Sequence, residues 1–179
     1  ETLIMLRDNG IQHLRTHIDI TDPHLTALKT VLEIKKDVED IIDIQIVAFP
    51  QEGTESFKAA RELMTEAVHI GADVIGGIPH YESTRELGIS SLHFLMGLAE
   101  KTGAMVDIHC DETDDPASRF LETLAEEARV RGLGSKVTAS HTCAMGSYDN
   151  AYCYKLFNNL KKSGINFISC PTESIHLQG

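Results

Sequence analysis

The chain has 179 residues, of which 42% are hydrophobic and 24% charged, which is ordinary for one globular domain with its own core. Its formal net charge of −11 argues against a nucleic-acid-binding role, because phosphates demand a basic surface. No apolar run approaches the ~20 residues of a membrane span and no signal peptide opens the chain, so we expect no membrane partner. The four cysteines show no CxxC spacing and are read as reduced thiols, so we expect a cytoplasmic protein.

Apolar periodicity, with glycine or proline at most element ends, predicts helices and strands in regular alternation. In chain order, we expect a helix at 3–9, a strand at 11–20, a helix from a cap at Thr21 or Asp22 to 38, a strand at 41–49, a helix at 55–69, a strand at 72–78, a helix from 84 or 90 to 101, a strand at 104–109, a helix at 115–131, a strand at 135–140, a helix at 148–162 and a strand at 165–170. Six strands that each alternate with one helix predict an α/β fold with a parallel sheet and helices on its faces.

Polar side chains recur at the ends of these strands, and they bear on the choice between an open sheet and a barrel. They are His17 and Asp19, Gln51 and Glu52, His80 and Glu82, His109 and Glu112, His141, and Glu173 and His176. Functional residues at the carboxyl ends of many strands are typical of a (β/α)8 barrel, and no strand here precedes a glycine-rich phosphate loop. A complete barrel needs eight strands and about 250 residues. We therefore expect residues 1–179 to form a single domain, an incomplete TIM-type barrel that is an internal piece of a larger enzyme.

Two histidines at corresponding strand ends are the strongest functional signal. His109 ends the strand at 104–109, Glu112 lies three residues later, and His141 follows the strand at 135–140. Parallel strands carry their carboxyl ends to one edge of a sheet, and two imidazoles beside a carboxylate suit a divalent metal. The pattern predicts half of a metal-hydrolase site.

Simpler interpretations of these polar residues stay open. A single histidine after a strand usually hydrogen-bonds a loop, and a single glutamate there is usually solvated. Asp111, Asp114 and Asp115 are explained as charges that are favourable at a helix N-terminus. His80 and His176 either line the pocket or hydrogen-bond backbone carbonyls.

Several segments, which together cover nearly the whole chain, resemble a known family. They are NGIQHLRTHID at 9–19, IVAFPQEG at 46–53, GADVIGGIPH at 71–80, DIHCDE at 107–112, TASHT at 138–142 and IHLQG at 175–179. The sequence resembles the amidohydrolase superfamily and, within it, the bacterial cytosine deaminases. The resemblance implies that the predicted strands are the second to seventh strands of the barrel. It also implies one divalent metal ion, Fe²⁺ or Zn²⁺, and hydrolytic deamination of a small pyrimidine-like substrate; we further expect a homo-oligomer.

The resemblance assigns roles to four residues. By similarity, His109 is a metal ligand, and His141 lies at the metal and the attacking water. Glu112 matches the carboxylate that shuttles protons, and Gln51 matches the position that binds the ring edge of the substrate. The first-strand His-x-His pair and the last-strand Asp of the family pattern are absent, which we attribute to truncation. We expect the chain as given to bind metal weakly and to be inactive or nearly so.

The chemistry accounts for these residue types. Ammonia leaves a cytosine-like ring only after water adds, and a bound divalent cation can lower the pKa of water toward ~7. A glutamate beside it can protonate the ring nitrogen and then the departing amine. A side-chain amide offers both a donor and an acceptor, so Gln51 can match an amide-like ring edge.

Two alternatives to a deaminase of cytosine or a close cyclic amidine remain. The first is a sibling amidohydrolase that acts on isoguanine, creatinine or an aminotriazine. The second is a metal-free binding module on a decayed barrel. Metal content and ammonia release separate the module from the enzymes, and a substrate panel separates the two enzymes.

Overall fold

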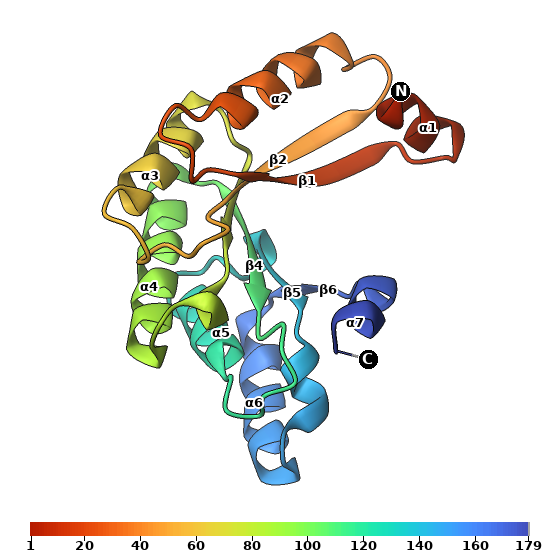
Figure 1. Ribbon diagram of the computed structural model, residues 1–179. Helices are drawn as coiled ribbons and strands as arrows, with labels where there is room; N and C mark the ends of the chain where they lie inside the picture. Colours follow the sequence, from red (N-terminus) through yellow and green to blue (C-terminus); the bar gives the residue numbers. More distant parts are fainter. Residues whose placement is uncertain (179) are drawn as a thin grey trace.

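The computed structural model describes residues 1–178 and contains a six-stranded sheet in the order β1-β2-β3-β4-β5-β6. Gly179, the last residue of the IHLQG segment, lies outside the described residues. The strands are β1 (His13–Asp19), β2 (Asp43–Phe49), β3 (Val74–Gly77), β4 (Met105–Cys110), β5 (Val137–His141) and β6 (Asn166–Ile168). Every neighbouring pair is parallel. The sheet curls into a half-barrel, which confirms the predicted part of a TIM-type barrel (Figure 1).

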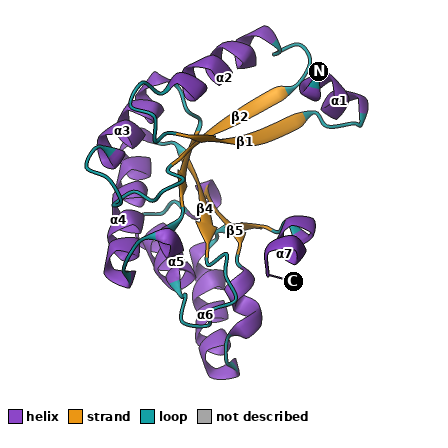
Figure 2. Ribbon diagram, in the orientation of Figure 1, coloured by secondary structure: helices purple, strands orange, loops and turns teal. Residues whose placement is uncertain are grey.

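Helices alternate with the strands and lie mainly along one side of the curled sheet (Figures 1 and 2). They are α1 (Thr2–Asp8), α2 (Thr26–Asp37), α3 (Ala60–Ile70), α4 (Arg85–Thr102), α5 (Phe120–Val130), α6 (Asn150–Ser163) and α7 (Pro171–Gln178). Three short 3-10 turns, η1 (Pro79–Tyr81), η2 (Gly134–Lys136) and η3 (Cys143–Ser147), complete the order. No helix in the described part of the chain combines the length and the apolar character that crossing a membrane requires.

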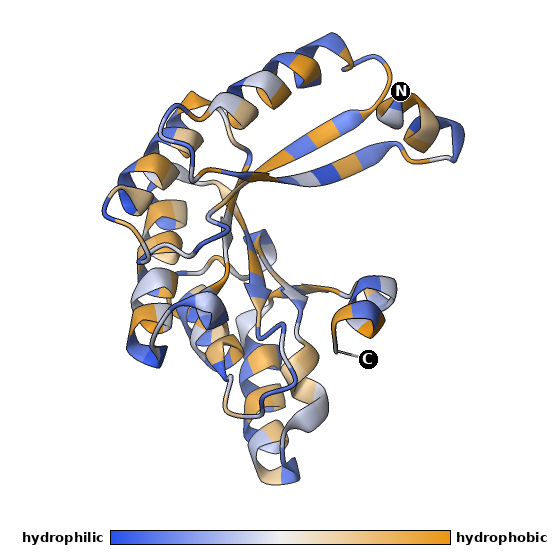
Figure 3. Ribbon diagram, viewed as in Figure 1, coloured by the Kyte–Doolittle hydropathy of each residue, from blue (hydrophilic) through white to orange (hydrophobic). Residues whose placement is uncertain are grey.

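The core lies between the sheet and helices α2 to α6. Strand residues Ile46, Ile75 and Ile108 are fully buried, as are Leu95 of α4 and Leu121 of α5. Hydrophobic and hydrophilic residues alternate in bands along each helix, because only one face of each contacts the sheet (Figure 3). Burying each such side chain contributes roughly 1.5–3 kcal/mol, so this layer holds the strand ends in place.

Close approach of α4 to the sheet requires a glycine in β3. A Cβ added at Gly77 would lie 2.5 Å from the Leu95 side chain and 2.9 Å from the Ile108 side chain. A larger residue there would force the Leu95 and Ile108 side chains to move.

Three predicted helix starts are wrong, and an aspartate explains the difference at two of them; the third helix, α3, begins at Ala60 rather than at 55. Helix α5 begins at Phe120 rather than at 115, because the Asp111 side chain accepts hydrogen bonds from the backbone N–H groups of Phe120 (3.0 Å) and Leu121 (2.8 Å). Helix α2 begins at Thr26, because Asp22 accepts the Thr26 N–H and closes a turn before the helix. Helix α7 was not predicted from the sequence at all.

Candidate metal centre

Three side chains converge at the carboxyl edge of the sheet: His109, Glu112 and His141. One potential ligand atom from each lies within 4.8 Å of the other two. Nδ1 of His109 lies 3.7 Å from Glu112 Oε2, and Nδ1 of His141 lies 3.2 Å from Glu112 Oε1. The two rings pack edge to face with centroids 4.4 Å apart. The structure thus brings together the three residues that the sequence singled out, while their roles stay predictions.

Local backbone geometry aims these side chains at one spot. Strands β4 and β5 are neighbours, and their register pairs Cys110 with His141. Asp111 and His141 have φ values of 58° and 71°, in the left-handed region that non-glycine residues rarely adopt. Each such residue costs of order 1–3 kcal/mol and persists where surrounding contacts enforce it, which is common at functional sites.

Contacts of the Asp111 side chain hold the loop that carries Glu112 in its conformation. Its buried carboxylate accepts from Ser118 Oγ at 2.6 Å and from the two backbone N–H groups that begin α5. Its own backbone carbonyl accepts from the N–H of Ala144, beyond β5. The interpretation of Asp111 as a charge at a helix N-terminus agrees with these contacts.

We expect Asp111→Ala to lower the free energy of unfolding by about 2–4 kcal/mol, because it leaves several buried donors unsatisfied. Asp111→Asn keeps one acceptor oxygen and should cost less. Asp114→Ala, at an exposed neighbouring carboxylate, is the matched control. Urea denaturation of the three variants measures the difference; equal losses for Asp111→Ala and Asp114→Ala would refute the anchoring role.

A third imidazole, which the sequence noted only as a strand-end residue, joins the centre from β1. His17 Nε2 lies 3.3 Å from His109 Nε2, and the Phe49 ring packs against both. Below them, fully buried Asp107 is paired with Arg15 at 2.8 Å. The sequence signal that could have placed His17 at the centre is the alternation of polar residues, with a period of two, along β1 and β4.

Burial controls the protonation of the centre. Burial, together with the nearby imidazoles of His17, His141 and His80, lowers the pKa of His109 to about 3. Burial also lowers the pKa of His17. Burial, with a hydrogen bond to Glu173 and its charge, raises the pKa of Glu112 to about 7. The centre therefore holds neutral imidazole, which can ligate a metal, beside a carboxyl group that can hold or release a proton near neutrality.

The lowered pKa of His109 predicts acid sensitivity of the metal-free protein. The folded-state pKa of about 3 lies below the ordinary 6.5, so below pH 6.5 the unfolded chain takes up a proton that the folded protein resists. This contribution to stability is complete above pH 6.5 and is lost as the pH falls toward 3, by up to ~1.4 kcal/mol per pH unit. Urea denaturation of the wild type and His109→Asn across that range should show a steeper fall for the wild type. Parallel curves would contradict the assignment.

Glu173 reaches the centre from α7. Its Oε2 lies 3.1 Å from His141 Nδ1. The sequence noted Glu173 only as a polar residue after a strand, and the missed helix α7 is what carries it inward.

The other candidates lie around the centre. Gln51 is exposed in the turn after β2, two residues beyond Phe49, and its substrate-binding role stays a prediction. Burial lowers the pKa of His80, while the charge of Asp111 and the backbone of His109 oppose that shift, and both earlier interpretations of His80 stay open. His176 is exposed on α7.

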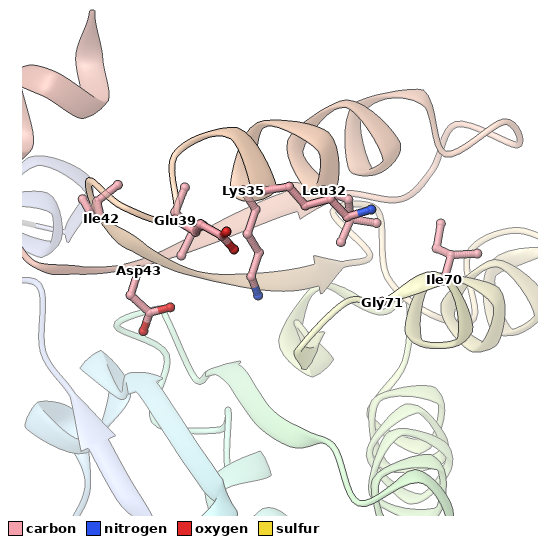
Figure 4. Close-up of a pocket in the computed structure, with 9 residues that line it drawn as sticks. Leu32, Lys35, Glu39, Ile42, Asp43, Ile70 and Gly71 are labelled. Atoms are coloured by element: carbon pink, nitrogen blue, oxygen red, sulfur yellow. The ribbon is translucent and has the colours of Figure 1, made fainter.

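A surface cavity of about 420 Å³ lies at the opposite, amino-terminal end of β2, between α2 and the turn after α3 (Figure 4). Its lining includes Lys35, Glu39 and Asp43. Because Asp43 begins β2 while Phe49 ends it at the centre, this cavity has no part in the site.

The donor set at the centre fits a divalent cation. Two partly buried imidazoles and one carboxylate, with potential ligand atoms within 4.8 Å, are the groups that Fe²⁺ and Zn²⁺ accept in hydrolytic sites. A catalytic site of this kind keeps one position for water.

Comparisons with known proteins identify the family of this chain. The model of the amidohydrolase family matches residues 5–178. The structure of 5-methylcytosine deaminase from Klebsiella pneumoniae, liganded with phosphonocytosine, is 70% identical with a TM-score of 0.98; the match covers 99% of this chain and 43% of that one. N-isopropylammelide isopropyl amidohydrolase of Pseudomonas sp. (strain ADP) is 29% identical over 90% of this chain and 40% of its own length. Pterin deaminase of Rhizobium rhizogenes is 27% identical over 95% of this chain and 38% of its own. The chain thus spans less than half the length of these relatives.

Proposed function

We propose, from the premise that this chain belongs to the amidohydrolase family, that it forms part of the catalytic barrel of a metal-dependent deaminase. The reaction is hydrolysis of a C–N bond in cytosine or a close cyclic amidine, with release of ammonia. The observation that carries the proposal is the convergence of His109, Glu112 and His141 on one spot at the carboxyl edge. The 70% identity to a protein described as 5-methylcytosine deaminase supports the substrate class.

In this proposal the two histidines hold the cation. Burial keeps His109 neutral, so that a ring nitrogen offers its lone pair, and His141 faces the same spot from the adjacent strand. Bound Fe²⁺ or Zn²⁺ would supply water acidic enough to attack at neutral pH.

Glu112 moves protons. With its pKa raised to about 7, its carboxyl group can donate to the ring nitrogen as water attacks, and can then deliver a proton to the leaving amine. Gln51 would pair with the ring edge of the substrate through its amide. Cytoplasmic location, homo-oligomeric assembly and a role in pyrimidine salvage belong to the same proposal, as does the treatment of residues 1–179 as one domain.

The test uses the purified full-length protein. We expect about one equivalent of iron or zinc per chain and ammonia release from cytosine or 5-methylcytosine. Absence of both metal and ammonia would favour the metal-free binding module and overturn the proposal.

A sibling activity is the second candidate. The Pseudomonas relative, which is 29% identical to this chain, is named N-isopropylammelide isopropyl amidohydrolase rather than a cytosine deaminase. A panel of isoguanine, creatinine and an aminotriazine alongside cytosine decides between the two. Higher kcat/KM for any panel member than for the cytosines would transfer the proposal to that ring.

A further inference from the structure

We propose that Glu173 is a positioning residue of the metal centre, which fixes the ring of His141 through its Nδ1 nitrogen. This inference rests on the proposed function and deepens it. It adds a carboxylate that reaches the centre from α7, outside the His109, Glu112 and His141 set.

The geometry around His141 Nδ1 carries the inference. Glu173 Oε2 lies at 3.1 Å and Glu112 Oε1 at 3.2 Å from this nitrogen. The His141 side chain is 92% buried, since only 8% of it is exposed. Oε2 of Glu173 is also buried, although 43% of the whole side chain is exposed. Neither this oxygen nor His141 Nδ1 has a hydrogen-bond partner of good geometry among the described residues, so the 3.1 Å approach is a close contact of two groups that can still pair. One oxygen of Glu173 therefore faces the centre, where water does not compete for it.

This contact determines which ring nitrogen of His141 carries the hydrogen. A neutral imidazole carries one N–H and one lone pair, and the nitrogen that faces carboxylate oxygens is the one that gains from carrying the hydrogen. A protonated Nδ1 leaves the lone pair on Nε2, which then serves as the ligand or acceptor. Histidines that bind metals commonly donate their other N–H to a carboxylate, which fixes the ring and its tautomer.

Competition between the two carboxylates links Glu173 to proton transfer. One Nδ1–H can satisfy only one carboxylate fully. Glu173, at 3.1 Å, competes with Glu112, at 3.2 Å, for that hydrogen. Removing Glu173 should therefore draw Glu112 toward His141 and impair both metal binding and turnover.

The experiment compares Glu173→Ala, Glu173→Gln and the matched control Thr172→Ala in the full-length holoenzyme. Thr172 is exposed in the same first turn of α7. We expect Glu173→Ala to weaken metal affinity by roughly 10–100-fold and to lower kcat more than it changes KM. Glu173→Gln keeps an acceptor oxygen, so it should restore both within about threefold. The visible spectrum of the cobalt-substituted enzyme should change in Glu173→Ala and return in Glu173→Gln.

Each outcome decides the matter. If Glu173→Ala matches Thr172→Ala in metal affinity, kcat and cobalt spectrum while the wild type is active, Glu173 has no positioning role. If Glu173→Gln loses metal as fully as Glu173→Ala, the carboxylate is a direct ligand and the positioning role is overturned. A wild-type protein that holds no metal and releases no ammonia would instead contradict the proposed function itself.

Discussion

Glu112→Gln in the full-length protein should retain its metal and have a kcat that is about 10²–10⁴-fold lower than that of the wild type. The amide has nearly the shape of the carboxyl group, so its neighbours His109 and His141 keep their places. It cannot pass a proton from water to the ring and the leaving amine. The measurements are kcat for ammonia release and metal content by elemental analysis.

The matched control for this prediction is Glu126→Gln, at an exposed carboxylate on α5 that pairs with Arg129. It should leave kcat within about twofold of the wild type. A Glu112→Gln enzyme with wild-type kcat would remove Glu112 from the mechanism. Loss of metal in this variant would make Glu112 a ligand rather than a proton carrier.

His109→Ala should abolish turnover and weaken metal binding by at least about 100-fold, because it removes a proposed metal ligand and leaves a hole beside His17. Metal affinity is measured by competition with a chelator, and activity by ammonia release. His93→Ala is the control, since His93 is a half-exposed histidine on α4 that pairs with Glu127.

His109→Ala and His93→Ala each delete one imidazole, so a difference between them reports on the position of the histidine in the molecule. The control should keep its metal and its activity. Retention of one equivalent of tightly bound metal by His109→Ala would place the cation elsewhere in the molecule.

Much of the fold could be predicted from local sequence. The apolar runs around Ile46, Ile75 and Ile108 mark buried parallel strands, and glycines close several helices. The convergence of His109 and His141 followed from one rule, that neighbouring parallel strands share a carboxyl edge.

The parts that escaped prediction depend on contacts between distant segments. The start of α5 is set by Asp111, nine residues earlier, which no local helix signal encodes. The place of Glu173 depends on α7 folding back toward β5, and the contact of His17 with His109 depends on the curl of the sheet from β1 to β4. Which side chains meet across the half-barrel depends on how strongly the sheet curls, and that curl is set by all six strands together.

The carboxylate of Asp111 ties two otherwise separate properties to one side chain. It starts α5, and it holds the loop in which the next residue is Glu112. Laboratory evolution aimed at new substrates should therefore find Asp111 nearly immutable, because most changes there would destabilise the fold before selectivity could improve. The exposed residues 114–117 of the same loop are the place where sequence diversity should be tolerated.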